Sequence, residues 1–387
     1  MTYVDDRVVY DADSHLMELP DWLASYADPD VRPRIRDLEL AGAGALAAEA
    51  VLQAEQRRGD ADAAARLEAD LLTKKGWHAL GAFDRDERSR ALDLFGFSSQ
   101  LVFSTFAATQ FLGRDVDLVV GGTRAHNRAM VDFCAADDRL VAVAQVPWIG
   151  PEPTLTLVTE AIDGGCGAVL FPSHPGRGLS PTHPDYDAVW ATLEDRGIPF
   201  MLHVGGAGRT LKPAFHANGR PVSDFLGGGE NVRAKDYMAI HQIPEQFLAA
   251  LVLDGVLDAH PGLRGGCIEQ GAMWVVPWLR RLDLAQRTFS RTERTLRDLT
   301  LDASDYVHRQ LWFTPFPREP VGWMIEECGD DLFLFSSDYP HPEGTKDPVA
   351  RFEETMDGIG ADARDRFYAG NYADMMGMPA PARSGGR

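Results

Sequence analysis

The stretch Val8-Val9-Tyr10-Asp11-Ala12-Asp13-Ser14-His15 is a run of β-forming residues that ends in metal-ligand side chains. It is the first of eight such runs, which cover residues 8–13, 100–106, 140–147, 167–173, 198–204, 263–269, 310–315 and 332–337. Amphipathic stretches typical of helices lie between them, at residues 116–136, 153–163, 185–196, 237–259, 272–288 and 319–327. Strands that alternate with helices favour a parallel sheet of the α/β class. Eight such units predict a closed (β/α)8 barrel.

The alternative is an open, doubly wound sheet, but no Gly-x-Gly-x-x-Gly turn follows the first run.

We expect residues 1–378 to form one barrel domain and residues 379–387 to form a disordered tail. Residues 37–75 contain few β-formers and interrupt the alternation, which predicts a helical insertion after the first strand. Its helices could cap the mouth of the barrel, or pack against the barrel or a second subunit.

The composition limits the classes of partner. The chain has 387 residues with 38 Lys and Arg against 58 Asp and Glu, a net charge of −20. This sign disfavours nucleic acids and anionic membranes and leaves a small-molecule substrate. The four cysteines form no CxxC pair, so neither a disulfide framework nor a thiolate zinc site is predicted. With no signal peptide and no apolar run long enough for a membrane span, we expect a cytoplasmic protein.

Side chains that bind metals or transfer protons follow several of the predicted strands. Asp13 and His15 are two residues apart, so an extended strand directs both to one face. The other candidates are His174 after the fourth strand, His203 on the fifth, Glu269 on the sixth and Asp338 after the eighth. The carboxyl ends of barrel strands share one mouth, where barrel enzymes keep their active sites. Taken singly, His203 could be a core histidine, His174 a surface histidine and Asp338 a turn residue.

Several longer stretches make the chain resemble a known family. They are Asp11-Ala12-Asp13-Ser14-His15-Leu16-Met17-Glu18, Leu202-His203-Val204-Gly205, residues 260–274, and Phe335-Ser336-Ser337-Asp338-Tyr339-Pro340-His341. These stretches resemble the amidohydrolase-2 branch of the amidohydrolase superfamily. The resemblance implies a (β/α)8 barrel with one or two divalent ions, which hydrolyses or decarboxylates small organic acids and their derivatives. It also implies that Asp13, His15, His203 and Asp338 are metal ligands and that the protein is a homodimer. Such ligands suit iron, zinc or manganese.

One residue departs from the pattern of this family. Decarboxylating members carry a histidine on strand 6, where this chain has Glu269. A carboxylate cannot replace an imidazolium, but it could bridge a second metal ion, with His174 and His203 nearby. The other interpretation is a buried acid held by an arginine or a backbone N–H. Glu269 therefore favours metal-assisted hydrolysis, with Asp338 as the proton acceptor and Glu269 assisting.

The expected substrate is an activated acyl carbonyl, either a thioester of the acyl-CoA type or an ester of a small organic acid. The chain is loosely similar to the metal-dependent thioesterases of terpenoid antibiotic biosynthesis. The long loop at residues 205–235 carries five basic and two acidic residues, so Arg209 and Lys212 would bind an anionic substrate. His341 would hydrogen-bond the substrate, or lie in a rigid turn between prolines. The alternative functions are decarboxylation of an aromatic or unsaturated acid, and ligand binding without catalysis.

Overall fold

Parallel strands form one curled sheet in the computed structural model, which describes residues 2–38, 44–58, 60–176, 178–205, 211–220 and 234–380. The seven strands are β1 (Tyr10–Leu16), β2 (Ser99–Ser104), β3 (Leu140–Gln145), β4 (Ala168–Leu170), β5 (Phe200–His203), β6 (Gly265–Ile268) and β7 (Leu311–Phe313). Each strand pairs with the next in chain order, from β1 to β7. This order excludes a doubly wound sheet, in which the strand order reverses within the sheet.

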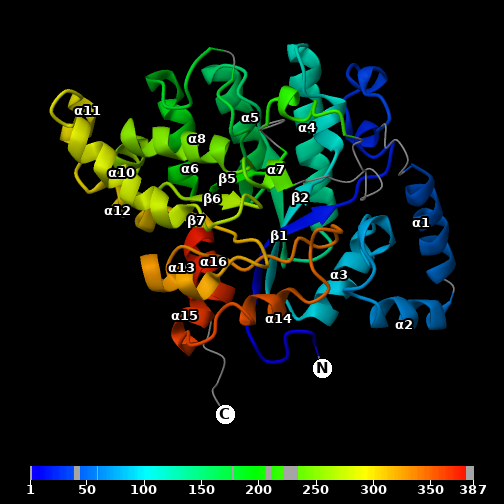
Figure 1. Ribbon diagram of the computed structural model, residues 1–387. Coiled ribbons are helices and arrows are strands. Elements are labelled where there is room, and N and C mark those ends of the chain that lie inside the picture. The colour runs from blue at the N-terminus through cyan, green and yellow to red at the C-terminus, as the bar shows by residue number, and fades with distance from the viewer. Residues whose placement is uncertain are drawn as a thin grey trace.

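Helices surround the sheet (Figure 1). Their bounds are α1 Gly44–Arg57, α2 Ala61–Ala69, α3 Arg85–Phe95, α4 Val116–Cys134, α5 Pro151–Asp163, α6 Asp187–Arg196, α7 Ala234–Tyr237, α8 Gln242–Leu253, α9 Val256–Ala259, α10 Val275–Phe289, α11 Arg294–Asp298, α12 Ala303–Gln310, α13 Val321–Cys328, α14 Pro348–Glu353, α15 Ala361–Asp365 and α16 Asn371–Met376. Asp84 and Asp115 cap the starts of α3 and α4 by accepting hydrogen bonds from backbone N–H groups of the first turn. Helices α1 and α2 lie within residues 37–75, at the edge of the molecule in Figure 1.

The eighth predicted strand, residues 332–337, is not a regular strand, and this part of the prediction is wrong. The segment makes only isolated bridges, Phe333 to Phe313 of β7 and Tyr339 to Ser14 of β1. The backbone N–H of Ser337 donates to the side chain of Asp11 at 2.8 Å instead of to a β1 carbonyl, which interrupts the ladder. The segment nevertheless bonds to both edge strands, so the curled sheet is consistent with a TIM-barrel-like amidohydrolase fold.

The inside of the curled sheet is packed with side chains from every strand. The inner cluster contains Tyr10, Leu101, Val143, Ala168, Met201, Ile268, Trp312 and, from the eighth segment, Leu334. Tyr372 and Met375 of α16 join this cluster, and α16 lies on the side of the molecule that carries both chain ends (Figure 1). The opposite ends of the strands are their carboxyl ends, where the candidate residues lie.

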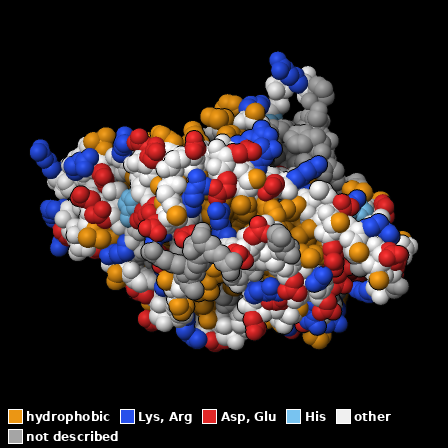
Figure 2. Space-filling model, turned by 90° about the horizontal axis from the view of Figure 1, so that it is seen from below, with side chains coloured by type: hydrophobic (Ala, Val, Ile, Leu, Met, Phe, Trp, Pro, Cys, Tyr) orange, Lys and Arg blue, Asp and Glu red, His pale blue; other side chains and the backbone are white. Residues whose placement is uncertain are grey.

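Charged side chains of both signs lie around a hydrophobic area on the face where the chain ends lie (Figure 2). Figure 2 shows acidic and basic side chains interspersed there. Ion pairs such as Arg7 with Glu353 and Arg366 with Asp374 pair some of these charges. None of the helices among the described residues is long and apolar enough to cross a lipid bilayer.

Candidate metal centre

Metal-ligand side chains converge at the carboxyl ends of the strands in two groups that share His15. The first group is Asp13, His15, His203 and Glu269, and the second is His15, Asp338 and His341. Within each group the ligand atoms lie within 4.8 Å of one another. The structure thus divides the four ligands that the family resemblance implied, because Asp338 lies with His341 and not in the first group.

Neighbouring donor atoms in the site lie 3.2–3.7 Å apart. His203 Nε2 lies 3.6 Å from Glu269 Oε2 and 3.3 Å from Asp13 Oδ1. His15 Nε2 lies 3.2 Å from the same Asp13 oxygen and 3.7 Å from Asp338 Oδ1. Neighbouring donors that each lie about 2.1 Å from one ion are roughly 3.0–3.5 Å apart. The observed spacing is therefore close to that of ligands around a metal ion.

A β-bulge directs Asp13 and His15 into the mouth. Tyr10 and Ala12 of β1 already belong to the inner cluster, so strict alternation would turn Asp13 and His15 outwards. The pairing of β1 with β2 shifts register between Asp11 and Ser14. A bulge inserts an extra residue on one strand and reverses the facing of the residues beyond it. The inner cluster and the metal-ligand pair can therefore occupy the same side of one strand.

Glu269 and Asp338 share a rare backbone conformation. Their φ angles are 53° and 51°, in the left-handed region that side-chain-bearing residues seldom adopt. The Glu269 N–H donates to the Thr314 hydroxyl at 2.7 Å, and the Asp338 N–H donates to the Asp13 carbonyl at 3.0 Å. Such strain costs about 1–3 kcal/mol and is concentrated at functional sites. The conformation holds two carboxylates at the mouth that regular strands would direct elsewhere.

Burial and hydrogen bonding prepare the imidazoles to bind a cation. Burial, together with the neighbouring His341, lowers the pKa of His15 to about 4, so this ring is neutral at pH 7. Burial alone would raise the pKa of Asp13, but His203 and His15 lower it below its usual value. His203 Nδ1 lies 2.9 Å from the Val204 carbonyl oxygen, which can only accept a hydrogen bond. His203 Nε2 faces the carboxylates of Asp13 and Glu269, so this ring is oriented to bind a cation together with them.

This donor set fits a divalent metal ion. Both ring nitrogens of His15 are buried without a hydrogen bond to any described residue, which is rare for buried polar atoms. Imidazole nitrogens and carboxylate oxygens together suit zinc, iron and manganese. The free cysteines belong to neither group. Asp13, His15, His203 and Asp338, with Glu269 and His341 beside them, are the described residues that could hold such an ion.

Other predicted site residues lie away from these groups. His174 is exposed and lines a separate cavity of about 480 Å³ next to α8. Strand β4 ends at Leu170, and among the described residues His174 belongs to neither group of candidate metal ligands. Lys212 is exposed, and Arg209 lies outside the described residues, as does most of the loop at 205–235. His341, predicted to contact substrate, stacks on His15 with ring centroids 3.8 Å apart.

Residues 10–375 match the family model Amidohydro_2, described as amidohydrolase. The chain belongs to this amidohydrolase family. No curated protein matches it in sequence. Among solved structures, an amidohydrolase from Mycobacterium avium subsp. paratuberculosis superposes with a TM-score of 0.72 at 20% identity, covering 96% of this chain and 99% of that chain.

Two solved decarboxylases also share the fold of this amidohydrolase. One is 5-carboxyvanillate decarboxylase from Novosphingobium aromaticivorans, solved with manganese and 4-hydroxy-3-methoxy-5-nitrobenzoic acid (TM-score 0.64, 16% identity, 97% and 98% of the two chains). The other is dihydroxybenzoic acid decarboxylase from Polaromonas sp. JS666, solved with manganese and the inhibitor 2-nitroresorcinol (TM-score 0.62, 17% identity, 96% and 97% of the two chains). At sequence identities of 16–20%, the similarity to these three structures shows a common fold.

The metal-ligand groups of the amidohydrolase open into a cavity of about 220 Å³. Its polar lining includes His15, His203, Glu269 and His341. Its apolar lining includes Phe103, Phe106, Leu112 and Leu170. A cavity of about 150 Å³ can hold a benzene molecule. The cavity therefore has room for one substituted ring or an aliphatic chain of similar size.

A buried carboxylate shapes the wall of this cavity. Glu18 accepts hydrogen bonds from the backbone N–H groups of Thr105, Phe106 and Ala107 at 2.9, 3.0 and 3.1 Å. Thr105 and Phe106 line the cavity, and Phe106 stacks on Trp77 with centroids 5.6 Å apart. The sequence indicates this role of Glu18 only through its position just after the first strand. The backbone groups that it binds lie more than 80 residues away in the chain, so no local pattern reveals them.

Asp11 joins β1 to the segments on either side of it. Its carboxylate accepts hydrogen bonds from Gln100 Nε2 of β2 at 2.7 Å and from Ser337 Oγ at 2.6 Å. Burial raises the pKa of Asp11 to about 7. This residue therefore supports the strand that carries Asp13 and His15 without being one of the candidate ligands.

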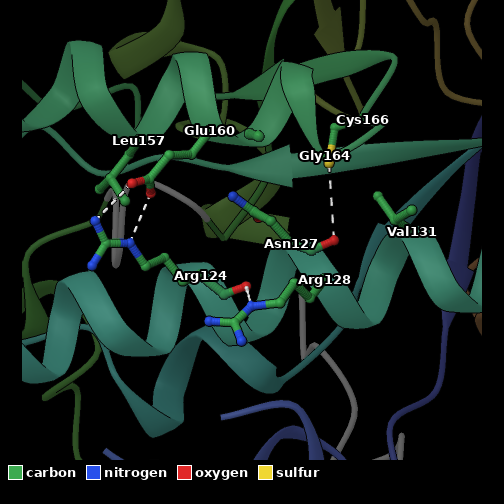
Figure 3. Close-up of a pocket in the computed structure, with 9 residues that line it drawn as sticks. Arg124, Asn127, Arg128, Val131, Leu157, Glu160, Gly164 and Cys166 are labelled. Carbon is green, nitrogen blue, oxygen red and sulfur yellow. Dashed lines mark hydrogen bonds and ion pairs between the residues drawn. The ribbon is translucent and has the colours of Figure 1, made fainter. Parts of the chain in front are cut away.

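A second cavity, of about 410 Å³, lies between α4 and α5 and contains no metal-ligand group (Figure 3). Arg124 at its rim pairs with Glu160, as Figure 3 shows, and Arg128 pairs with Asp28. Asn127, also in its lining, accepts from the Gln145 N–H at 2.9 Å. Gln145 lines the cavity at the metal-ligand groups, so α4 holds the end of β3 in position.

Proposed function

We propose that this amidohydrolase is a divalent-metal-dependent decarboxylase of a small aromatic or unsaturated carboxylic acid. The observation that carries the proposal is the cavity of about 220 Å³, whose lining combines candidate metal ligands with the rings of Phe103 and Phe106. A cavity of this size takes one substituted ring and is small for a complete acyl-CoA thioester. Phe103 and Phe106 would stack against the ring and orient it.

The solved relatives support the same reaction class. Two of them are decarboxylases of substituted benzoic acids with bound manganese. They favour the alternative prediction, decarboxylation, over the thioester hydrolysis that Glu269 first indicated. Manganese is accordingly the metal that we propose, in place of the open choice among iron, zinc and manganese.

The residues of this chain have separate tasks in that reaction. Asp13, His15, His203 and Asp338 would hold the ion, which supplies positive charge for the carboxylate or an adjacent hydroxyl of the substrate. When the bond to the carboxyl carbon breaks, CO₂ leaves and its bonding electrons remain on the substrate carbon. A proton must then be added to that carbon. Glu269 and His341 both line the cavity and would be the groups that deliver it.

A specific residue supports a second candidate function, the hydrolysis of an ester or thioester. Glu269 lies 3.6 Å from His203 in the first ligand group, where a carboxylate can accept a proton from an attacking water. The acyl group would lie in the same cavity and the leaving group would extend towards solvent.

One experiment distinguishes the two functions. The manganese-loaded protein is incubated in D₂O with a panel of hydroxybenzoates and unsaturated acids, and in parallel with aryl esters and acyl-CoA thioesters. Decarboxylation releases CO₂ and leaves one deuterium on the carbon that carried the carboxyl group. Absence of CO₂ from every acid, together with release of acid and alcohol or thiol from the esters, would reject decarboxylation in favour of hydrolysis.

A further inference from the structure

We propose that Gln145 determines substrate specificity, because its side-chain amide binds a hydroxyl group that lies away from the carboxyl group of the substrate. This inference rests on the function proposed above, in which the candidate metal ligands hold the carboxyl end of an organic acid. It adds what is recognised at another part of the same cavity. The enzyme would then select hydroxy acids over acids that carry an alkyl group at the same position.

The alternation of β3 directs the side chain of Gln145 into the cavity. Val143 belongs to the inner cluster of the sheet, whereas Ala142 and Ala144 belong to the core cluster that the sheet shares with the surrounding helices. Gln145 follows Val143 by two residues, so its side chain leaves the same face of the strand. It lines the cavity of about 220 Å³ together with Leu170, its register partner in β4.

Helix α4 fixes the backbone of Gln145. Pairing of β3 with β2 ends at Ala142, so β2 does not bond to the last residues of β3. Asn127 of α4, labelled in Figure 3, takes its place. The Gln145 N–H donates to Asn127 Oδ1 at 2.9 Å, and Asn127 Nδ2 donates to the Gln145 carbonyl at 3.3 Å. A side chain on a backbone held at both polar groups is well placed to bind a ligand precisely.

The side-chain amide of Gln145 is available to a ligand. The residue is only 4% exposed, and among the described residues its side-chain amide makes no hydrogen bond. Buried polar groups are usually paired, so a ligand group that pairs with this amide is favoured. By contrast, the hydroxyls of Thr105 and Thr109, also in the lining, already donate to the carbonyls of Leu16 and Phe106.

The chemistry of the lining points to a hydroxyl group as the partner. A primary amide offers N–H donors and a carbonyl acceptor, and a hydroxyl group can both donate and accept. The described residues that line the cavity include no Lys or Arg, so a second carboxylate of the substrate would lack a counter-charge there. A methyl group of similar size would leave the amide unpaired, and such a site rejects the analogue that lacks the hydroxyl.

The strand order separates Gln145 from the candidate metal ligands. Asp13 and His15 lie on β1 and His203 lies on β5, and β3 is two strands away from each. Neighbouring strands are about 4.8 Å apart, so the backbone of Gln145 is roughly 9–10 Å from either strand. A hydroxyl group that reaches Gln145 is therefore not the one next to a carboxyl group held at the ligands.

Matched pairs of acids test the inference. Binding of 3-hydroxybenzoate and 3-methylbenzoate, and of 4-hydroxybenzoate and 4-methylbenzoate, is measured by calorimetry on the manganese-loaded protein. Neither hydroxyl group is adjacent to the carboxyl group, so the two cannot chelate one ion. We expect the unaltered protein to bind at least one hydroxy acid about 10- to 100-fold more tightly than its methyl partner. Gln145→Met, similar in length but without an amide, should reduce this ratio to about one.

A control variant in the same cavity is Ser104→Ala. Ser104 lines the cavity, but Phe103 before it belongs to the inner cluster, so alternation directs Ser104 away from the inside of the sheet. This variant should keep the preference for the hydroxy acid. Loss of the preference in Ser104→Ala, with its retention in Gln145→Met, would assign the hydroxyl group to Ser104 and overturn the inference.

The outcomes separate this inference from the proposed function. Equal binding of both acids in each pair, or an unchanged ratio in Gln145→Met, would overturn the role of Gln145, while CO₂ release still decides whether the protein is a decarboxylase. No binding of any acid and no CO₂ release would overturn both. A crystal structure of the unaltered protein with the preferred hydroxy acid gives an answer even if a variant fails to fold. A hydroxyl group within about 3.2 Å of the Gln145 amide supports the inference, and a hydroxyl group bound elsewhere rejects it.

Discussion

Replacing Glu18 with alanine tests how the cavity wall is held. The buried Glu18 carboxylate accepts hydrogen bonds from three successive backbone N–H groups, at residues 105–107. These residues precede and begin the 3₁₀ turn Ala107–Gln110, and Thr105 and Phe106 line the cavity. The Glu18→Ala variant leaves the three N–H groups without this acceptor, so the loop between β2 and α4 should lose its fixed position.

The size of the effect can be worked out from these contacts. A buried N–H that loses its acceptor costs about 1–3 kcal/mol, which sets an upper limit of roughly 9 kcal/mol for the three, since the bonds of Thr105 and Phe106 are only partly buried. Burial raises the pKa of Glu18, which shows that its charge is itself costly to bury. Removing the carboxylate recovers that cost, on the order of several kcal/mol. We therefore expect a loss of about 2–5 kcal/mol in the free energy of unfolding, and a rise in KM of roughly tenfold.

The chain offers a matched control in Glu319. This carboxylate is also buried and also accepts from three backbone N–H groups, those of Ala272, Met273 and Phe316, at 2.7, 3.2 and 2.9 Å. None of these three residues lines the cavity of about 220 Å³. Glu319→Ala should lose similar stability with a much smaller change in KM.

Urea unfolding and steady-state kinetics on the preferred acid measure both quantities for the two variants. Unchanged stability in Glu18→Ala, or an equal change of KM in the two variants, would show that Glu18 does not hold the cavity wall.

Three further predictions concern the metal, the cavity and pH. His203→Ala should lose at least tenfold in manganese affinity by titration, and unchanged affinity would place the ion elsewhere. Phe106→Ala removes one wall of the cavity, so the ratio of kcat/KM between a bulkier and a smaller acid should rise about tenfold, and a constant ratio would contradict this role. Burial lowers the pKa of His126 from 6.5 to about 4, so between these pH values the unfolded chain binds a proton that the folded protein does not. The free energy of unfolding should therefore fall by up to about 3 kcal/mol from pH 6.5 to 4, and an equally steep fall in His126→Gln would disprove this source.

Local sequence patterns predict most of the fold. Runs of β-forming residues correspond to β1–β7, and the helical stretches between them correspond to α4, α5, α6, α8, α10 and α13. The exceptions depend on distant partners. Ser337 leaves the regular ladder because its N–H donates to Asp11, more than 300 residues away, and no local pattern encodes that contact. The bulge in β1 likewise depends on how β1 pairs with β2.

The sequence predicts those residues of the candidate site that lie at the carboxyl ends of strands. Asp13, His203 and Glu269 follow from the rule that the carboxyl ends of barrel strands share one mouth. His174 belongs to neither group, because the segment after β4 places it in a separate cavity beside residues of α8. His341 lies against the candidate metal ligands because the chain folds back after Asp338, with the His341 N–H bonded to the Asp338 carbonyl at 2.8 Å. The spacing of three residues between Asp338 and His341 could not show whether His341 lies beside the candidate metal ligands or contacts the substrate.

Whether the protein is a metal-dependent decarboxylase is decided by the dependence of CO₂ release on manganese. CO₂ release from the panel of aromatic and unsaturated acids is measured with the metal-free protein before and after addition of Mn²⁺. We expect no release before addition and release from at least one acid afterwards, lost again in Asp13→Ala. Equal release without metal, or none from any acid after manganese binds, would contradict it.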